Sequence, residues 1–440
     1  MTKRASDNRS PLPLRREAHQ GSYQGVTSPE CVNWGGDDRA WNQNFTNAGN
    51  EGNQNANNKT NTNKSVRPVR RLSPTTANLT IEEVITAYED CRRYKRNKPT
   101  TIDFECDFAH NIMDIFERVT DLSWKPIGHM CFVVRSPKVR EVWASPFSDR
   151  VVHHIVYNRL RPRFEPGFIA TTFACIPNRG TGPAGDWAEK AARKVTQGWS
   201  RPAYVLQADI ANFFPSINAY RLCNTLLEKS PEPWLANLVK QIILVNVKEN
   251  AYFPGDPTLF DFVPKHKSLW HKPRGVGLPI GNLTSQFGAN VDMDPVDQSF
   301  VRGKPVAQYG RYVDDIVMLD TNKETLEVAL DKLAQQLEGM GLGLNMSKTT
   351  IRPTDHGFDF CGRFIKPHRT YLRRATVRRG NKAMQYLKTS EHPSETATSY
   401  LALARHCDAY NLRCKWGRMA NEAGLKTDSQ LTKAIAGGFA

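Results

Sequence analysis

Apolar residues recur every three or four positions in several separate parts of the chain, which is the spacing of one face of an amphipathic helix. The first run follows Asn78 and Thr80, which are helix-capping residue types, and begins with two glutamates that suit the first turn of a helix. The three clearest runs are Ile81, Val84, Ile85, Tyr88 and Cys91; Val151, Val152, Ile155, Val156 and Leu160; and Leu326, Leu330, Leu333, Leu337 and Met340. We therefore expect a helix over each run, and further helices in the basic C-terminal 70 residues.

Short β-rich runs between these helices predict strands. Two such runs flank Ser136-Pro137 and precede the second helix, so a hairpin feeding a helix is expected there. The stretch RPAYVLQADIANFFPSI predicts a strand that ends at an aspartate, and VAQYGRYVDDIVMLD predicts two strands that meet at a pair of aspartates. GLGLNMSKTTIRP and FDFCGRFIKP predict further strands. Strands and helices mixed in this way indicate an α+β fold in which helices cover a sheet.

The first 73 residues differ from the rest of the chain. They contain almost no periodic apolar pattern and are rich in Asn, Arg, Ser, Gly and Pro. A segment of this composition buries too little apolar surface to offset the entropy lost on ordering it. We expect residues 1–73 to be disordered and the fold to begin near Pro74.

The charge of the chain indicates a polyanionic partner. Its 440 residues carry 60 Lys and Arg against 44 Asp and Glu, a formal net charge of +16, which favours nucleic acid over an acidic membrane surface. No stretch reaches the roughly 18 consecutive apolar residues of a membrane span, and the N-terminus lacks a secretory signal, so a cytoplasmic protein is expected. The nine cysteines form no C-x-x-C pair, which argues against a zinc site or a disulfide framework and predicts reduced, mostly buried thiols.

Three aspartates stand where predicted strands end. Asp209 ends one strand, and Asp314 and Asp315 lie where two strands meet, so a tight hairpin would project at least one carboxylate from the end of a sheet. Two divalent ions about 3.5 to 4 Å apart accelerate nucleotidyl transfer, and Mg²⁺ prefers oxygen ligands such as carboxylates. An Asp-Asp pair is also common in ordinary turns, so the pair alone leaves both interpretations open.

The surrounding motifs resemble those of the reverse transcriptases. ADIANFFPSI is similar to their first metal-binding motif, and YVDD to their Y-x-D-D turn. GLPIGNLTSQ lies between the two, where the family has its template- and nucleotide-positioning motif; NMSKT contains a matching lysine, and FCGRFI resembles the primer-grip hairpin. The matches span about residues 80–410. They imply an RNA-directed DNA polymerase with the right-hand fold of fingers, palm and thumb.

By this resemblance the chain divides into four parts. Residues 1–73 form the N-terminal segment, 74–200 the fingers, 201–370 the palm with its antiparallel sheet and helices, and 371–440 a short helical thumb. Within the palm range, residues 218–275 partly belong to the fingers as an insertion.

The resemblance also assigns catalytic roles. Asp209, Asp314 and Asp315 are expected to bind two Mg²⁺ ions, for which Mn²⁺ can substitute, with the backbone carbonyl of Ile210 as a further ligand. Lys348 matches a lysine beside the departing pyrophosphate, where a cation stabilises developing charge and can donate a proton. An exposed lysine at a strand end is the alternative.

A second group of residues is expected to contact the nucleotide or the template. Phe214 matches the aromatic residue that packs under the incoming sugar and excludes a 2′-hydroxyl, whereas Phe213 better suits a core position. The remaining candidates are Lys138, Arg140, Arg150, Arg179, Ile280, Gly281, Gln286 and Tyr312. Arg140 is the first choice among the basic residues, because cations there suit the triphosphate. The glycines beside Arg179 fit either a phosphate contact or an ordinary turn.

The GLPIGNLTSQ motif discriminates among reverse transcriptases. Many of them have glutamine before the motif glycine and proline after its serine, whereas this chain has Ile280 and Gln286. This form resembles the enzymes of diversity-generating retroelements, which copy template adenines with errors. Loss of an amide beside the nascent base pair removes hydrogen bonds, which fits weaker selection against mispairs. Ile176 and Pro177 depart from the pattern, because related enzymes more often have basic residues there.

That resemblance implies partners and an origin. The partners are an RNA template, an RNA/DNA hybrid, deoxynucleoside triphosphates and a separate basic accessory protein, in a prokaryotic or phage-encoded element. Residues 33–70 resemble a template repeat translated in frame, with a polar linker as the alternative. A defence-type enzyme and an RNA-binding scaffold are further alternatives. A group II intron enzyme is disfavoured, since only about 70 residues and no Cys/His cluster follow the palm.

Overall fold

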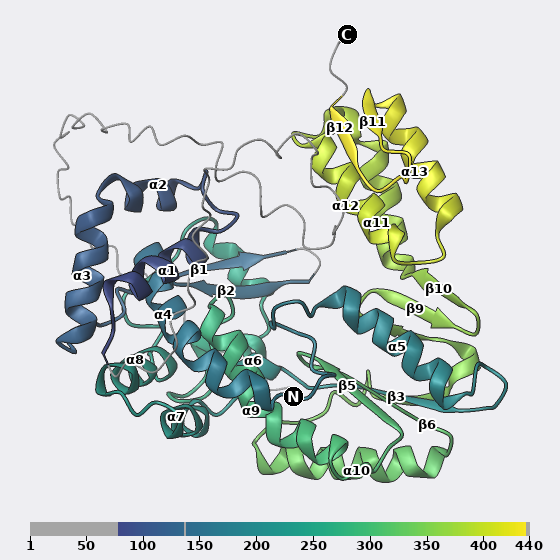
Figure 1. The fold of residues 1–440 in the computed structure, drawn as a ribbon, viewed down its shortest axis with the longest axis horizontal. Helices are drawn as coiled ribbons and strands as arrows, with labels where there is room; N and C mark the ends of the chain where they lie inside the picture. The colour runs from purple at the N-terminus through teal and green to yellow at the C-terminus, as the bar shows by residue number, and fades with distance from the viewer. Residues whose placement is uncertain (1–77, 136–137, 437–440) are drawn as a thin grey trace, which may run out of the picture. The chain divides into compact units, whose positions relative to one another are not determined.

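The computed structural model describes residues 78–135 and 138–436 (Figure 1). The expected disordered segment 1–73, the start of the fold near Pro74 and the candidate template repeat at 33–70 lie outside the described residues. Nothing in the described ranges combines the helix length and apolar character needed to cross a membrane.

α-Helices form nearly half of the described chain. They are α1 (Ile81–Arg92), α2 (Pro99–Cys106), α3 (Phe108–Thr120), α4 (Phe147–Phe164), α5 (Thr181–Val195), α6 (Phe213–Ser216), α7 (Ala219–Glu228), α8 (Pro233–Ile243), α9 (Leu283–Val301), α10 (Lys323–Gly339), α11 (Arg374–Gln385), α12 (Pro393–Arg405) and α13 (Tyr410–Glu422). The three helices predicted from apolar spacing are confirmed as α1, α4 and α10. Thr80 and Glu83 form a capping box at the start of α1, as the capping residues before it suggested.

The strands form four small sheets. They are β1 (His129–Val134), β2 (Arg140–Ala144), β3 (Tyr204–Asp209), β4 (Ala251–Tyr252), β5 (Gln308–Tyr312), β6 (Asp315–Asp320), β7 (Thr350–Pro353), β8 (Phe358–Phe360), β9 (Arg363–Lys366), β10 (Arg369–Leu372), β11 (Leu425–Thr427) and β12 (Ala434–Ala436). The strand orders are β2-β1-β4, β5-β6-β3-β7, β10-β9-β8 and β11-β12. The predicted β1–β2 hairpin before α4 and the predicted β5–β6 hairpin are both confirmed.

One strand prediction and one helix prediction need correction. The stretch 341–353 forms a strand only over β7, because residues 345–349 fold into a turn in which Thr349 N–H donates to the Asn345 carbonyl. The C-terminal residues form the expected helices, but they also contain the β11–β12 hairpin, whose strands are too short to show a period.

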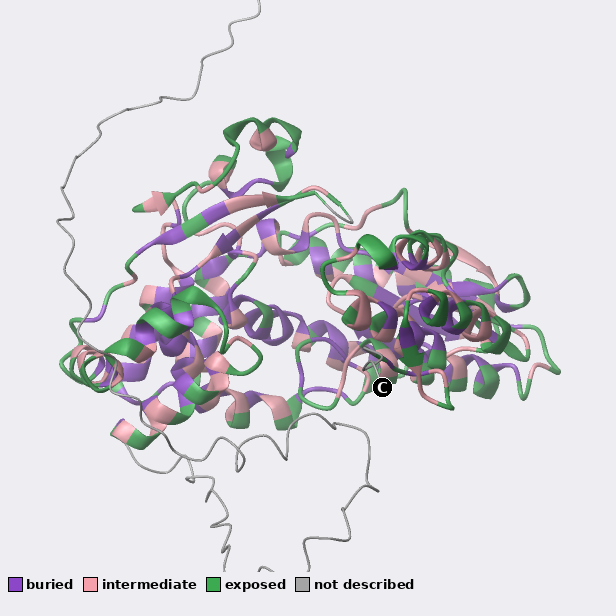
Figure 2. Cartoon of the chain, turned by 90° about the horizontal axis from the view of Figure 1, so that it is seen from above, coloured by how far each residue is buried: buried purple, intermediate pink, exposed green. Residues whose placement is uncertain are grey.

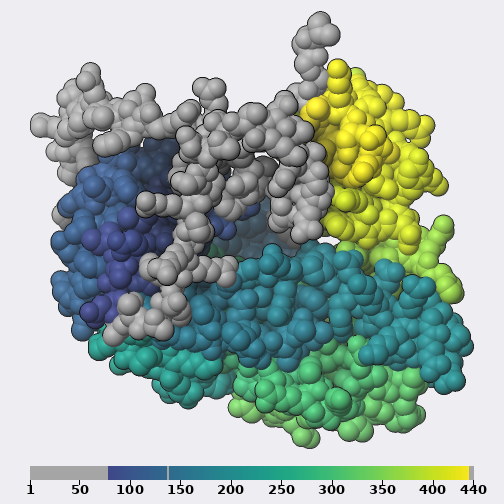
Figure 3. Space-filling model, viewed as in Figure 1, coloured from purple at the N-terminus to yellow at the C-terminus, as the bar shows by residue number. Residues whose placement is uncertain are grey.

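Helices cover both faces of the antiparallel β5-β6-β3-β7 sheet. Val205, Val317 and Leu319 point to one face, where they pack with α5 and with the β8–β9 hairpin. Leu206 and Met318 point to the other face, toward α9 and α10. In the space-filling view the blue-teal surface of the region around α5 lies next to the green surface of the region around α10 (Figure 3).

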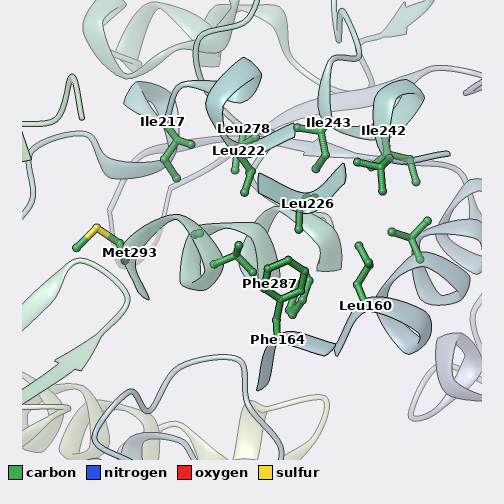
Figure 4. Close-up of a cluster of buried hydrophobic side chains, with 14 of the residues drawn as sticks. Leu160, Phe164, Ile217, Leu222, Leu226, Ile242, Ile243, Leu278, Phe287 and Met293 are labelled. Atoms are coloured by element: carbon green, nitrogen blue, oxygen red, sulfur yellow. The ribbon is translucent and has the colours of Figure 1, made fainter. Parts of the chain in front are cut away.

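The largest apolar cluster joins α4, α7, α8 and α9 (Figure 4). Its labelled members are Leu160, Phe164, Ile217, Leu222, Leu226, Ile242, Ile243, Leu278, Phe287 and Met293. Phe287 of α9 packs edge-on against Phe164, with ring centroids 6.0 Å apart. Full burial of such a side chain contributes about 1.5 to 3 kcal/mol, so this cluster fixes α9 in place. Buried residues lie where elements face one another, and exposed residues lie on the outer turns (Figure 2).

The cysteine prediction is partly wrong. The described cysteines are all free thiols, as expected. Three of them, Cys91, Cys131 and Cys223, are buried, whereas Cys106 and Cys175 are exposed and the other three are half-buried. The sequence predicts that the thiols are reduced, but it does not predict how far each one is buried.

A buried polar network ties the β1–β2 hairpin to the start of α9. The Ser145 hydroxyl lies 3.3 Å from His129 Nε2 and 3.2 Å from His153 Nε2. His153 Nδ1 lies 2.6 Å from the Thr284 hydroxyl, and Ser145 N–H donates to Asn282. Burial lowers the pKa of His129 to about 4 and that of His153 to about 3, so both rings are neutral at neutral pH.

These histidines predict loss of stability in mild acid. The pKa of histidine in the unfolded chain is about 6.5. As the pH falls below this value, His153 becomes protonated in the unfolded chain but stays neutral in the folded protein. Between pH 7 and pH 5 this costs about 2 kcal/mol of unfolding free energy per buried histidine. Urea unfolding at the two pH values should show a smaller pH dependence for His153→Gln, by about that amount. His356→Gln, at an exposed histidine, serves as the control; an unchanged pH dependence in His153→Gln would contradict the prediction.

Candidate nucleotidyl-transfer site

The β5–β6 hairpin turns through only two residues, Val313 and Asp314. Tyr312 pairs with Asp315 across the hairpin, and Val313 has a φ of 58°. In two-residue hairpins a positive φ at this first position normally calls for glycine, and valine is both β-branched and bulky. The turn is therefore strained, and strain of this kind persists where the surrounding structure enforces it.

Register brings Asp209 of β3 directly opposite Asp315 of β6. The Ile210 N–H donates to the Asp314 carbonyl at 3.0 Å, which makes Asp209 and Asp315 a non-hydrogen-bonded pair of the antiparallel ladder. In such pairs the two side chains share a sheet face with Cβ atoms about 4.5 to 5.5 Å apart. The strands thus place two carboxylates side by side, with Asp314 next to them in the turn.

The three carboxylates, hereafter the acidic triad, are close enough to influence one another electrostatically. Burial raises the pKa of Asp315 to about 6, and repulsion from Asp314 and Asp209 adds to this rise. Burial also raises the pKa of Asp314, again with a contribution from Asp209. Lys348 opposes both shifts. The cluster therefore carries an excess of negative charge that a cation would relieve.

Two residues of the NMSKT segment hold Asp209. The Lys348 ammonium lies 2.6 and 2.7 Å from the two carboxylate oxygens of Asp209. The Asn345 side-chain amide donates to Oδ1 at 3.1 Å, and its backbone N–H donates to the Asp209 carbonyl at 2.7 Å. The Lys348 side chain is 47% exposed, so it lies at the site and remains accessible to a ligand. The 345–349 turn brings this lysine back to the end of β3.

The oxygen donors of the acidic triad have the chemistry that Mg²⁺ prefers. Asp209, Asp314 and Asp315 supply carboxylates, and the Ile210 carbonyl follows directly on β3. In the described residues, no group of three or more His, Cys, Asp or Glu side chains is already arranged around an ion position. Asp209 is turned toward Lys348 instead. A metal ion bound here would share the Asp209 carboxylate with the Lys348 ammonium or replace it.

The predicted basic residues fall into different surroundings. Arg140 is exposed on β2, and its charge lowers the pKa of Asp314, so it lies near the acidic triad. Lys138 is exposed just before β2. Arg150 stacks over the Phe147 ring at 5.4 Å within α4. Arg179 donates to the backbone carbonyls of Ile169 and Thr172, at 2.7 and 2.8 Å. The position of Arg140 therefore supports a substrate contact more strongly than the positions of Arg150 and Arg179 do.

The GLPIGNLTSQ motif packs against β2. The Trp143 N–H donates to the Ile280 carbonyl at 2.8 Å. Gly281 has a φ of 133°, and a Cβ atom there would lie 2.8 Å from the Trp143 carbonyl oxygen, so only glycine fits this approach. Gln286 is exposed at the first turns of α9 and accepts a hydrogen bond from the Cys175 thiol.

The two remaining predicted contacts are half-buried. Phe213 is buried, whereas Phe214 is partly exposed in the short helix α6, as the sequence suggested for this pair. Tyr312 packs at the edge of the cluster between the sheet and α5. Each therefore presents part of its ring to solvent near the ends of β3 and β5.

Sequence reasoning missed three residues near the site. Asn345 contacts Asp209, Arg373 lowers the pKa of Asp315, and Arg311 donates to the carbonyl of Val313. Asn345 and Arg311 stand inside the quoted motifs, and Arg373 stands in the basic run RRATVRR. Their positions in or near the quoted motifs were visible in the sequence, but their contacts depend on turns and on partners far away in the chain.

A family model described as reverse transcriptase (RNA-dependent DNA polymerase) matches residues 136–365, just over half of the chain. The chain belongs to the reverse transcriptase family. The matched range of this reverse transcriptase contains the acidic triad, Lys348 and the GLPIGNLTSQ motif.

Two solved telomerase structures are similar to this reverse transcriptase. Apo telomerase from Candida tropicalis truncated from its C-terminal domain matches with a TM-score of 0.38 and 13% identity, over 57% of this chain and 56% of that one. Apo telomerase from the same organism matches with a TM-score of 0.42 and 12% identity, over 63% of this chain and 53% of that one. The chain thus spans a little over half the length of these telomerase chains. A search of curated proteins found no match.

The packing of Gly281 leads to a prediction. Gly281→Ala should push the motif loop away from β2, at a cost of about 1 to 3 kcal/mol in unfolding free energy, and should raise the KM for nucleotide. Gly182→Ala is the matched control, because a Cβ atom there meets nothing within 4 Å. Denaturant unfolding and nucleotide titrations of both variants would test this. Equal stability of the two variants would contradict the close approach.

Proposed function

We propose that this protein is an RNA-directed DNA polymerase that copies a template-repeat RNA into adenine-mutagenised cDNA in a diversity-generating retroelement. The polymerase part rests on one observation above all: Asp209, Asp314 and Asp315 converge at adjoining strand ends within the range matched by the family. The retroelement part rests on the I-G-N-L-T-S-Q form of the motif.

The acidic triad would hold two Mg²⁺ ions, or Mn²⁺ in their place, with the Ile210 carbonyl as a further ligand. Bound there, the ions would supply Lewis-acid stabilisation of the attacking and leaving oxygens. Lys348, which lies on Asp209 and is half-exposed, would face the departing pyrophosphate and could donate a proton to it. Arg140 adds positive charge on the side of Asp314, where it suits the triphosphate. The half-exposed Phe214 ring is available to pack under the sugar and exclude a 2′-hydroxyl.

Ile280 supports the error-prone part of the proposal. Its carbonyl is held by Trp143, so its side chain belongs to a loop with a fixed backbone. An aliphatic group in this loop offers no hydrogen bonds to a nascent base pair, where glutamine would. Selection between correct and incorrect pairs would then depend more on shape than on hydrogen bonding.

The right-hand arrangement and the partners are part of this proposal. The β5-β6-β3-β7 sheet would be the palm, the β2-β1-β4 sheet part of the fingers, and residues 371–440 the thumb. The pairing of β4 with β1 supports counting part of 218–275 with the fingers. Partners would be template RNA, the RNA/DNA hybrid, deoxynucleoside triphosphates and a basic accessory protein, in the cytoplasm of a prokaryotic host.

Replacement of one triad carboxylate tests the polymerase. With RNA template, primer, Mg²⁺ and deoxynucleotides, Asp314→Ala should lower the rate of nucleotide addition by about a hundredfold or more, as expected for loss of a charge-stabilising group. Asp331→Ala, at an exposed carboxylate of α10, is the control and should keep the activity. Activity retained by Asp314→Ala would refute the proposed mechanism.

Restoring glutamine tests the retroelement assignment. Ile280→Gln should lower misincorporation at template adenines by about threefold to tenfold, because the amide regains hydrogen bonds near the nascent pair. Deep sequencing of cDNA made from the element's own template-repeat RNA measures this directly. Faithful copying by the unaltered enzyme, together with the absence of a template and variable repeat pair beside the gene, would instead favour a defence-type reverse transcriptase.

A further inference from the structure

A fully buried ion pair lies directly beneath the Val313-Asp314 turn. The side chains of Arg311 on β5 and Asp297 on α9 are 0% and 1% exposed. Arg311 Nε lies 2.8 Å from Asp297 Oδ1, and Nη2 lies 2.7 Å from Oδ2, so the guanidinium grips the carboxylate with two parallel hydrogen bonds. Burying two charges is costly, and removing one partner is strongly unfavourable, so such a pair is retained only in a well-satisfied setting.

The surroundings satisfy both members of this pair. Asp297 also accepts hydrogen bonds from the hydroxyls of Thr172 and Tyr309, at 2.8 and 2.7 Å. The remaining nitrogen of the guanidinium, Nη1, donates to Asn290 Oδ1 at 3.3 Å and to the backbone carbonyl of Val313 at 3.0 Å. Through Nη1 the ion pair is therefore hydrogen-bonded to Val313, the turn residue that has the strained backbone.

Two hydrogen bonds together fix the direction of Asp314. The bond from Arg311 to the Val313 carbonyl orients the peptide plane before Asp314. The bond from the Ile210 N–H to the Asp314 carbonyl orients the peptide plane after it. With both flanking planes held, the Cα–Cβ direction of Asp314 is set. Without the first bond, the peptide plane between the strained Val313 and Asp314 has lost a hydrogen bond that orients it.

Arg311 cannot contact substrate itself. Strand alternation places Gly310 and Tyr312 on the sheet face that carries Asp315, and Arg311 on the opposite face, toward α9. We propose that Arg311 and Asp297 are positioning residues for the acidic triad: they hold the Val313-Asp314 turn in the strained conformation that aims Asp314 at the metal ions. This inference rests on the proposed nucleotidyl-transfer function and assigns a role to residues outside its ligand set.

Arg311→Lys tests the role, because lysine keeps the charge but lacks the planar fork. We expect kcat for nucleotide addition to fall by about tenfold or more, because a small misplacement of a catalytic group is costly, while the KM for nucleotide changes little. Affinity for primer–template, measured by fluorescence anisotropy without nucleotide, should stay unchanged.

Arg221→Lys is the matched control. Arg221 also grips a carboxylate of α9, with Nε 3.0 Å from Asp292 Oδ1 and Nη2 2.7 Å from Oδ2, and it also donates to a backbone carbonyl, that of Met340. Arg221→Lys therefore reproduces the loss of a fork on the same helix away from the turn, and it should keep kcat. Equal kcat in the two variants would overturn the proposal.

A second set of variants separates positioning from folding. If Arg311→Lys does not fold, Arg311→Met combined with Asp297→Asn leaves no unpaired charge, and the same loss of kcat is expected. Adding Val313→Gly should recover part of that loss, by about threefold or more, because glycine adopts a positive φ without strain. No recovery in either background would overturn the role of strain.

Mn²⁺ binding separates this inference from the proposed function. Electron paramagnetic resonance titration should show Mn²⁺ affinity at least about fivefold weaker in Arg311→Lys than in Arg221→Lys, since one carboxylate is misdirected. A wild-type protein that binds Mn²⁺ but does not polymerise, with weakened binding in Arg311→Lys, would refute the function and keep the inference. An active wild type with unchanged Mn²⁺ binding in Arg311→Lys would keep the proposed function and refute the inference.

Discussion

The opposition of Asp209 and Asp315 across β3 and β6 is the constraint on which the rest of the site depends. Two like charges about 5 Å apart repel each other by about 3 kcal/mol at an effective dielectric constant of about 20. Backbone hydrogen bonds of the ladder hold the two Cβ atoms side by side, while water at the exposed Asp315 side chain screens part of this repulsion. Lys348 offsets it on Asp209, and Arg140 and Arg373 lower the pKa of the neighbouring carboxyls. The sheet therefore concentrates negative charge at the ends of β3 and β6, and this charge attracts further cations.

The pleat of the sheet places Asp209 and Asp315 on one face and Arg311 on the other. Along β5 and β6 alternate residues face opposite sides, so Tyr312 and Asp315 share the side of Asp209 while Arg311 faces α9. On the acidic side Gly310 leaves room for the Trp187 ring of α5, which a Cβ atom would meet at 2.4 Å. A shift of the register by one residue would exchange the two sides and bury the carboxylates among the apolar residues of α9 and α10. The register of β3 and β6 therefore decides, together with the identity of the aspartates, whether the carboxylates cluster at one face.

Much of this architecture was predictable from the sequence, because it depends on local periods and short turns. The spacing of Val151 to Leu160 predicted α4, and the two apolar runs around Asp314 predicted the hairpin, since each signal lies within one element. The motif resemblance also placed Lys348 at the site, and the structure shows it on Asp209. Arg311 and Asp297 were not found, because a buried charge is recognisable only once its partner is known and the two lie on different elements. The strand predicted over 341–353 forms only as β7, because residues 345–349 fold into a turn. Arg179 donates to backbone carbonyls, a contact that no sequence pattern reveals.

Helix α9 joins the two halves of the site. At its start, Asn282 and Thr284 belong to the buried histidine network that holds the β1–β2 hairpin. Two to four turns later, Asn290 and Asp297 bind the arginine under the strained turn. The core cluster around Phe287 packs the middle of this helix, so the GLPIGNLTSQ motif and the turn that carries Asp314 share one buried support. A helix with an apolar side in the core and polar groups toward both ends thus contacts both the GLPIGNLTSQ motif and the support of the Val313-Asp314 turn.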